Sequence, residues 1–224
     1  MISENLKKRL ITSSLLVLLI FLIVKSNQIL VYSLLVLGVF SLIEFFQIIN
    51  KIIKKNVFRF IFNMLFSLYI FFFCQLFFFF SSLIHLKFLL FTILIGCIAS
   101  DLGGYIFGKT FKGPRLTKIS PKKTFSGAAG SIIFTSVIIS SLFFYYTNVY
   151  GLKIFVLGIL VSLSNQAGDL FFSALKRKAK IKDTGNLLPG HGGILDRIDG
   201  ILIGVPLGII ILEENHTICR TIFS

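Results

Sequence analysis

The chain has 224 residues, of which 55% are hydrophobic and only 14% are charged. Soluble domains carry about a quarter charged residues, so a single aqueous core cannot bury this much apolar surface. The net charge of +14 would suit nucleic acid or anionic lipid, but the basic residues lie in short segments between apolar runs. We therefore expect a bilayer and phosphorylated or anionic ligands, and no nucleic-acid partner.

Apolar runs recur along the whole chain, which is not the pattern of one cleaved secretory signal followed by a polar protein. A membrane helix needs about 20 mainly apolar residues, and about seven segments qualify. Their approximate ranges are 10–24, 29–49, 57–83, 86–107, 127–146, 152–172 and 198–212. The pattern predicts an all-α, polytopic integral membrane protein with about seven transmembrane helices.

The Lys and Arg residues predict the orientation, because cytosolic loops are enriched in them. With the N-terminus in the cytosol, nineteen of these residues fall in inside segments. The other four, Lys25, Lys87, Lys153 and Arg220, fall outside. We therefore expect a cytosolic N-terminus and an external C-terminus.

The two halves of the chain differ in kind. Residues 1–95 carry one acid within the apolar region, Glu44, and otherwise look like packing helices, with the runs Phe71–Phe73 and Phe77–Phe80 expected to face lipid. Every Asp lies between Asp101 and Asp199. We therefore divide the chain into membrane helices for packing, 1–95, and a catalytic membrane region with a cytosolic-face active site, 96–224.

Two segments of the second half combine polar residues with a helix end. Asp101 next to a membrane helix is costly, so it is expected to face a partner or a water-filled cavity, although a helix-terminal or packing carboxylate is the other interpretation. Ser120, Lys122, Lys123 and Thr124 precede the next helix. Free N–H groups and the helix dipole favour an anion there. A basic anchor with an ordinary Pro turn explains this segment equally well.

Asp169, Ser173 and Lys176 are spaced at i, i+4 and i+7, which predicts one helix face. A carboxylate, a hydroxyl and a cation on one stripe suit a metal–phosphate complex. A salt-bridged helix end is the alternative.

The segment 182–199 contains Pro189 and several glycines, which indicate a shaped loop. Asp196 and Asp199 are three residues apart, so both point to the same side of the next helix start. Mg²⁺ binds oxygen ligands, and a few protein carboxylates are enough when a triphosphate completes its coordination shell. His191, between glycines, either orients this loop or contacts a phosphate.

At this point the residues resemble a known family. The matching positions are Ser173, Leu175, Lys176 and Arg177, then Lys182, Asp183 and Gly185, then Leu188, Pro189, His191, Gly192, Gly193, Ile194, Asp196, Arg197, Ile198 and Asp199. Together they resemble the signature of the phosphatidate cytidylyltransferases, or CDP-diacylglycerol synthases. Asp101, the run 120–124 and Gly168-Asp169 are also similar, so the resemblance covers roughly 96–205.

The resemblance implies transfer of CMP from CTP to phosphatidate, with pyrophosphate as the second product, in a bacterial inner membrane. It implies Mg²⁺ held by Asp169, Asp196 and Asp199, with a second cation and a homodimer left open. Phosphate contacts are expected from Lys122, Lys123, Lys176 and Arg197. The predicted catalytic residues are Asp169, Lys176, Asp196, Arg197 and Asp199. The predicted substrate-binding residues are Asp101, Ser120, Lys122, Lys123, Thr124, Ser173, Arg177, Lys182, Asp183 and His191.

The chain departs from the family pattern at Ser126 and Phe172, where the family usually has Glu. These departures put substrate fit or a second metal site in question. Two other functions are considered. A CTP-dependent polyprenol or phytol kinase would transfer the γ-phosphate to an alcohol, and a transporter or non-enzymatic scaffold would do no chemistry. A transporter predicts inverted repeats and polar groups at the bilayer midplane, whereas the acids here cluster at the cytosolic end.

Overall fold

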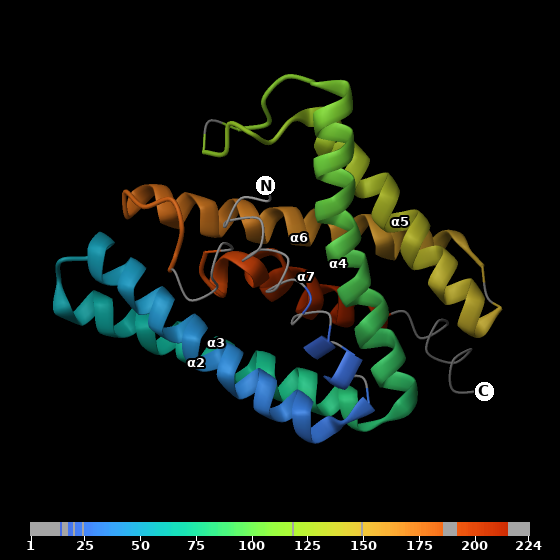
Figure 1. Cartoon of the computed structure of the whole chain (residues 1–224), viewed down its shortest axis with the longest axis horizontal. Coiled ribbons are helices and arrows are strands. Elements are labelled where there is room, and N and C mark those ends of the chain that lie inside the picture. The colour runs from blue at the N-terminus through green and yellow to red at the C-terminus, as the bar shows by residue number, and fades with distance from the viewer. Residues whose placement is uncertain are drawn as a thin grey trace, which may run out of the picture. The chain divides into compact units, whose positions relative to one another are not determined.

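The computed structural model describes residues 14, 18–19, 21–23, 25–117, 119–148, 150–185 and 192–214. The described part of the chain is helical, and its only extended pairing is an isolated bridge between Arg115 and Thr124. The named helices are α2 (Asn27–Ile52), α3 (Asn56–Ser82), α4 (Ile84–Phe111), α5 (Phe125–Thr147), α6 (Leu152–Lys178) and α7 (Leu195–Glu214) (Figure 1). The all-α prediction is confirmed.

Five of these helices, α2 to α6, are long and apolar enough to cross a membrane. They coincide with five of the predicted spans, and they confirm a polytopic membrane protein. The last predicted span, 198–212, lies in α7, which is helical but is not among the five. Most of the first predicted span, 10–24, lies outside the described residues.

The chain forms two compact units. Unit one comprises Met1–Ser82 and Leu175–Ile198, and unit two comprises Leu83–Ala174 and Asp199–Ser224. The boundaries therefore fall within α6 and α7. This packing division differs from the predicted functional division at residue 95, which stays a prediction about where the chemistry lies.

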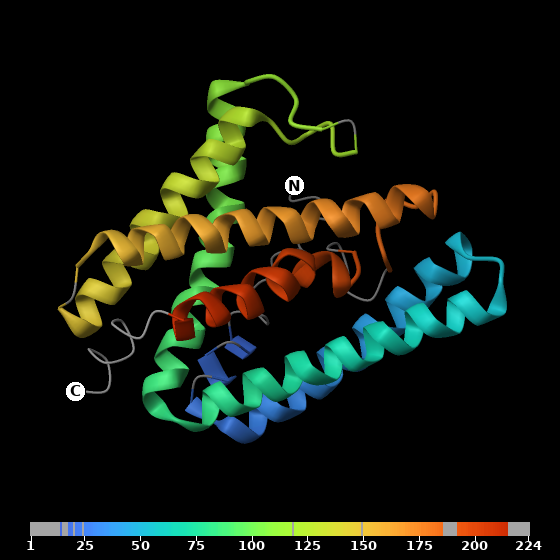
Figure 2. The same ribbon diagram turned by 180° about the vertical axis from the view of Figure 1, so that it is seen from behind.

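In unit one, α2 and α3 lie side by side, as both ribbon views show (Figures 1 and 2). Phe45 of α2 stacks on Phe66 of α3 with ring centroids 3.7 Å apart. Gly38 brings the two backbones together, since an added Cβ would lie 3.3 Å from an Ile70 methyl group. Aromatic stacking and a small residue at the crossing favour this pairing.

Both Phe-rich runs of α3 were predicted to face lipid, but only part of each run is exposed. Four residues are exposed, and three are buried at helical spacing: the exposed ones are Phe71, Phe72, Phe78 and Phe79, and the buried ones are Phe73, Phe77 and Phe80. Positions i, i+4 and i+7 share one helix face. The prediction was wrong for that face because composition alone does not separate the two sides of an all-apolar helix.

In unit two, α4 and α5 pack closely through small residues (Figure 1). A Cβ on Gly103 of α4 would lie 2.9 Å from the Gly130 carbonyl of α5. Buried hydroxyls add polar contacts, since Ser131 Oγ donates to the Ser100 carbonyl at 2.7 Å and Ser100 shares a hydrogen bond with Ser162 of α6. Small residues and interhelical hydrogen bonds are the usual means of helix association in lipid.

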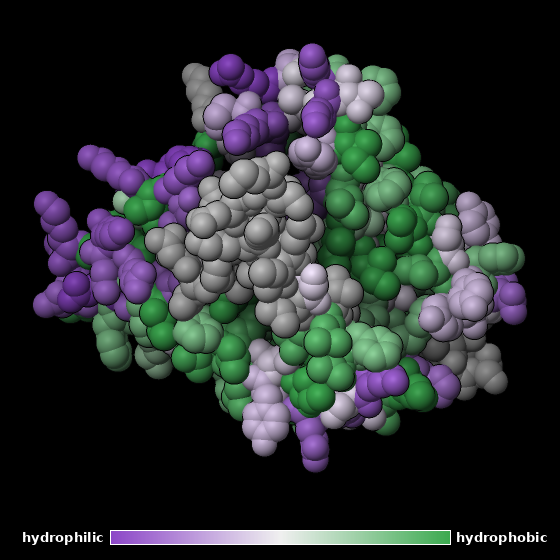
Figure 3. Space-filling view, in the orientation of Figure 1, coloured by the Kyte–Doolittle hydropathy of each residue, from purple (hydrophilic) through white to green (hydrophobic). Residues whose placement is uncertain are grey.

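Polar residues gather at the helix ends (Figure 3). In unit two they cover the loop 112–124, whereas hydrophobic residues cover α4 and α5. In unit one they cover the α2–α3 turn and the end of α6. This distribution is what a bilayer-spanning bundle requires, because charged side chains are costly within the hydrocarbon.

Candidate active site

A cavity of about 320 Å³ lies in unit two, where α4, the loop 112–124, the start of α5 and α6 meet. The site residues predicted from sequence that line it are Asp101, Ser120, Lys122, Lys123, Thr124 and Asp169. Two carboxylates, two ammonium groups and two hydroxyls thus converge from separate segments of the chain. Such a concave site with convergent polar groups is the usual form of a ligand site.

Asp169 projects from α6 and is paired with Lys123 of the loop 112–124. Ser173, one helical turn on, donates its hydroxyl to Asp169 Oδ1 at 3.3 Å. The predicted one-face arrangement of Asp169 and Ser173 is therefore confirmed. About a third of the Asp169 side chain is exposed, so its carboxylate can still contact a ligand.

Asp101 projects from α4 and accepts a hydrogen bond from Asn165 Nδ2 of α6 at 2.9 Å. The Asn165 side chain is fully buried, and its Oδ1 atom has no hydrogen-bond partner in the described structure. Gln166, beside it, lines the cavity and donates to Ser162. Neither amide is predicted from the sequence, although Asn165 lies one helical turn before Asp169 in an apolar segment, which is a detectable signal.

Thr124 caps the start of α5 and fixes one wall of the cavity. Its hydroxyl accepts the Gly127 N–H at 3.1 Å, and its backbone is extended, as an N-cap requires. The loop closes on itself, since Leu116 N–H donates to the Lys123 carbonyl at 2.8 Å. The predicted helix N-terminus with adjacent lysines is therefore present, with the geometry that favours a phosphate.

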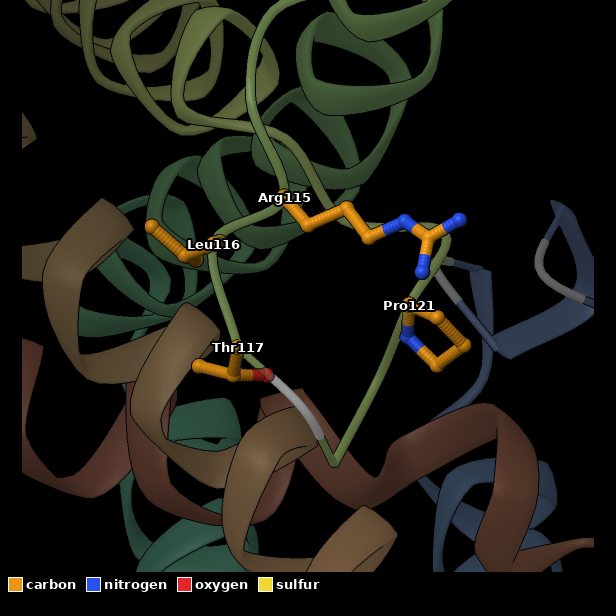
Figure 4. A pocket seen from close by; sticks show the side chains of 4 residues that line it. All are labelled: Arg115, Leu116, Thr117 and Pro121. Atoms are coloured by element: carbon orange, nitrogen blue, oxygen red, sulfur yellow. The ribbon is translucent and has the colours of Figure 1, made fainter.

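The loop 112–124 encloses a further opening of about 310 Å³ (Figure 4). Arg115, Leu116, Thr117 and Pro121 line it, and Arg115 extends from one arm of the loop toward Pro121 on the other. Arg115 is exposed. In the sequence, Arg115 contributes only to the predicted orientation, yet in the structure it adds a cation to a loop that already lines the main cavity.

The two departures from the family pattern have different surroundings. Ser126 accepts the Gly113 N–H at 3.2 Å and shares a hydrogen bond with Thr124 Oγ1 at 3.1 Å. It thereby ties the beginning of the loop to the start of α5. Phe172 is buried and packs edge-on against Phe171. Ser126 therefore retains a polar role, whereas Phe172 replaces an acid by apolar packing.

In unit one, Lys176 at the end of α6 pairs with Asp196 in the first turn of α7. Lys176 Nζ donates to Asp196 Oδ1 at 2.8 Å, and Asp196 Oδ2 accepts the N–H groups of Thr184 and Gly193. Burial alone would raise the pKa of Asp196, but these hydrogen bonds and the Lys176 charge outweigh it and hold the pKa below its ordinary value. Asp196 is thus ionised and firmly oriented.

Glu44 of α2 also contacts this part of unit one. Its carboxylate accepts hydrogen bonds from the Thr184 hydroxyl and from the N–H groups of Ile194 and Leu195. In the sequence, Glu44 stands out as an acid in an apolar region, but no role is predicted for it. Its partner Thr184 lies 140 positions further along the chain, so no local pattern connects them.

The remaining predicted residues are placed as follows. Arg177, Lys182, Asp183 and Arg197 are exposed, and Arg177 donates to the Ile181 carbonyl. Asp199 accepts the Gly200 N–H at 2.9 Å in unit two. A Cβ on Gly168 would lie 2.7 Å from the Asp199 carbonyl, so α6 and α7 approach closely beside Asp169. His191 lies outside the described residues.

The donor atoms fit a hard divalent cation. The cavity offers carboxylate and hydroxyl oxygens, which suit Mg²⁺, and no Cys or His among its lining residues. Among the described residues, no group of three or more His, Cys, Asp or Glu is arranged to hold a metal ion. A metal there would need ligand oxygens in addition to protein carboxylates. The set Asp169, Asp196 and Asp199 stays a prediction, because Asp196 belongs to unit one and the other two to unit two.

The sequence is similar to those of known proteins. The model of the cytidylyltransferase family matches residues 3–214. A phosphatidate cytidylyltransferase of Mycobacterium tuberculosis (strain ATCC 25618 / H37Rv) is 47% identical over 116 residues, which are 50% of this chain and 34% of that protein. One from Rickettsia felis is 42% identical over 115 residues, 48% of this chain and 51% of that protein. The matches thus span between about a third and a half of these relatives. Because the family model covers nearly the whole sequence, this chain belongs to the cytidylyltransferase family.

Proposed function

We propose that the chain is a phosphatidate cytidylyltransferase, which transfers CMP from CTP to phosphatidate and releases pyrophosphate. The observation that carries the proposal is the cavity of unit two, where Lys122, Lys123 and the start of α5 lie with Asp101 and Asp169. Cations and a helix N-terminus suit a triphosphate. Family membership and the names of the relatives support the same reaction.

The reaction needs positioning more than proton transfer. A phosphate monoester has a second pKa of about 6, so the phosphatidate oxygen is largely ionised at neutral pH. That oxygen bonds to the α-phosphorus of CTP while the bond from the α-phosphorus to the bridging oxygen of the β-phosphate breaks, and pyrophosphate leaves with that electron pair. Charge neutralisation by Lys122, Lys123 and Lys176 then lowers the barrier.

A magnesium ion, when bound, would neutralise phosphate charge between the two substrates. The residues proposed to hold it are Asp169, Asp196 and Asp199. The pairing of Asp169 with Lys123 supports this assignment. It places a charged carboxylate at the cavity, and this carboxylate could exchange the lysine for a metal ion. A second cation is a further proposal, and Asp101 is the carboxylate available for it.

The setting is proposed from the same features. Helices α2 to α6 fit a bilayer, and the Lys and Arg distribution favours an active site on the cytosolic face of a bacterial inner membrane. The cavity is lined in part by the polar loop 112–124 and by the start of α5, which also suits a soluble nucleotide meeting a membrane lipid. A homodimer is compatible with the proposal and is not needed by it.

The decisive experiment uses purified protein in detergent–lipid micelles with CTP labelled at either the α- or the γ-phosphorus. Phosphatidate and a long-chain polyprenol are supplied in parallel as acceptors. We expect the lipid to become labelled only from α-labelled CTP and only when phosphatidate is the acceptor. One pyrophosphate should be released for each lipid product. Label from the γ position in the polyprenol would replace the proposal by a lipid kinase. No transfer to either acceptor by protein that binds CTP would favour a non-enzymatic role.

A further inference from the structure

Glu44 is the most deeply buried carboxylate among the side chains that the structure describes, with 2% of the residue exposed. It lies in α2, far along the sequence from the residues that carry the family signature. Oε2 accepts the Thr184 hydroxyl at 2.6 Å and the Leu195 N–H at 2.9 Å, and Oε1 accepts the Ile194 N–H at 3.0 Å. All of these partners belong to the same compact unit as Glu44.

These contacts satisfy a buried charge. An ionised carboxylate removed from water is destabilising unless several donors surround it. Two of the three donors are N–H groups at the start of α7, which have no partner within the helix and lie at the positive end of its dipole. Glu44 and the beginning of α7 therefore stabilise each other, and either one alone would be unfavourable.

Two glycines of the signature make room for this carboxylate. A Cβ on Gly185 would lie 2.7 Å from Glu44 Oε1, and a Cβ on Gly193 would lie 2.0 Å from Thr184 Oγ1 and 2.5 Å from Glu44 Oε2. Real Cβ atoms do not approach oxygen so closely, so the chain on both sides of the segment 186–191 is shaped around Glu44. Gly185 and Gly193 thus have a physical explanation that involves a residue outside the signature.

Glu44 and Asp196 share the same backbone framework. Thr184 donates its hydroxyl to Glu44 and its N–H to Asp196 at 2.8 Å. Gly193 donates its N–H to Asp196, and the next two N–H groups along the chain donate to Glu44. A shift of Glu44 would therefore move the N–H donors that orient Asp196. The ion pair between Asp196 and Lys176 would then change its geometry.

We propose that Glu44 is a positioning residue of the active site, which acts through Thr184 and the start of α7 to fix Asp196 against Lys176. This inference deepens the proposed cytidylyltransferase function and rests on it for its kinetic consequences. It assigns to the N-terminal helices a part in the chemistry beyond packing. Glu44 itself touches no reacting atom.

The first test compares Glu44→Gln with Ser41→Ala. Gln keeps the volume of Glu44 but replaces one acceptor oxygen by a donor, so the N–H groups of Ile194 and Leu195 and the Thr184 hydroxyl cannot all be satisfied. Ser41 is a buried polar residue one turn earlier in α2 whose hydroxyl donates to the Leu37 carbonyl of its own helix, which makes it the matched control. We expect the kcat of E44Q, per CTP-binding site, to fall about 30- to 100-fold with KM for CTP within about threefold. S41A should keep the wild-type kcat.

A second pair of variants separates positioning from a general loss of structure. Thr184→Val removes the hydroxyl that contacts Glu44, whereas Thr184→Ser keeps it. We expect T184V to lower kcat in the same manner as E44Q, and T184S to restore most of it. Equal kcat in T184V and T184S, or a loss in E44Q that appears only in KM, would overturn the proposal.

Hydrogen exchange tests the same inference without any turnover. In the ligand-free protein, we expect the amides of residues 194–195 to exchange at least tenfold faster in E44Q than in wild type, with peptides from 125–135 unchanged. Unchanged exchange at 194–195 would overturn the positioning role even in an active enzyme. Faster exchange in a protein that transfers no CMP would instead leave Glu44 as the residue that orders this segment and reject only the cytidylyltransferase function.

Discussion

Lys176 Nζ lies 2.8 Å from Asp196 Oδ1, and this pair joins the end of α6 to the first turn of α7 within unit one. Both side chains are about nine-tenths buried. The second carboxylate oxygen accepts the N–H groups of Thr184 and Gly193. Asp196 therefore contacts α6 and both sides of the segment 186–191 at once, which makes it the central connection of the signature.

A double-mutant cycle should show this connection as a coupling energy. We expect Lys176→Met and Asp196→Asn each to destabilise the protein, because either change leaves a mostly buried charged group without its partner charge. The coupling should be about 1 to 3 kcal/mol. Chemical unfolding in detergent micelles measures it. Lys178→Met, on an exposed position of the same turn, should change stability by less than about 0.5 kcal/mol, and a coupling below that size would show that the pair does not form.

The stability of the protein should depend on Asp196 in acid. The pKa of Asp196 in the folded protein lies below its ordinary value of 3.8. The stabilisation by this carboxylate is therefore complete above pH 3.8 and is lost as the pH falls through the folded-state pKa. Melting temperatures of wild type and Asp196→Asn between pH 7 and pH 3 measure this. The difference in melting temperature between the two proteins should be constant above about pH 5 and should become smaller only in the most acidic samples. A difference that already becomes smaller at pH 6 would contradict the prediction.

Much of the fold follows from hydropathy, but helix ends do not. The predicted span 152–172 became α6, which continues to Lys178. Hydropathy misses the last turn because Lys176, Arg177 and Lys178 are charged, yet cations are favourable at a helix C-terminus. Similarly, α7 begins at Leu195, three residues before the predicted start, where Glu44 accepts the first N–H groups.

The site was predictable where its residues follow a local pattern. Asp169 and Ser173 share a face of α6 because of helical spacing, and the lysines before α5 lie at a helix N-terminus. The pairing of Lys123 with Asp169 and the contact of Asp101 with Asn165 depend on packing between helices. No periodicity within a helix encodes such contacts, so they required the structure.

Asp169 should be indispensable for turnover. Asp169→Asn removes the charge that faces Lys123 at the cavity and that we propose as a metal ligand. We expect kcat for transfer of the α-phosphorus to fall by several orders of magnitude, measured as CDP-lipid formed with Mg²⁺ in excess. Ser164→Ala is the matched control, since Ser164 lies on α6 and bonds to the Leu160 carbonyl of the same helix. Near-wild-type turnover in D169N with equal membrane expression would reject the role.

Metal removal should abolish the reaction reversibly. With EDTA we expect no CDP-lipid, and excess Mg²⁺ should restore the original rate, because the carboxylates proposed as metal ligands would repel a triphosphate unless a cation lay between them. Binding can be followed apart from activity, since a ligand that binds only the folded state raises the melting temperature. In the presence of CTP, Mg²⁺ should raise the melting temperature of wild type and raise that of Asp199→Asn much less. Full activity in EDTA would remove the metal from the proposal.

Thr124 should set both the stability of α5 and the affinity for CTP. Its hydroxyl accepts the Gly127 N–H and contacts Ser126, and it lies at the cavity wall. Thr124→Ala should lower the stability by about 1 kcal/mol, as loss of an N-cap does, while Thr124→Ser should keep it. Because an uncapped first turn frays and its N–H groups no longer converge on a phosphate, we expect T124A to raise the Kd for CTP about tenfold. Calorimetric titration with CTP measures this, and equal Kd values for T124A and T124S would mean that the start of α5 does not bind the nucleotide.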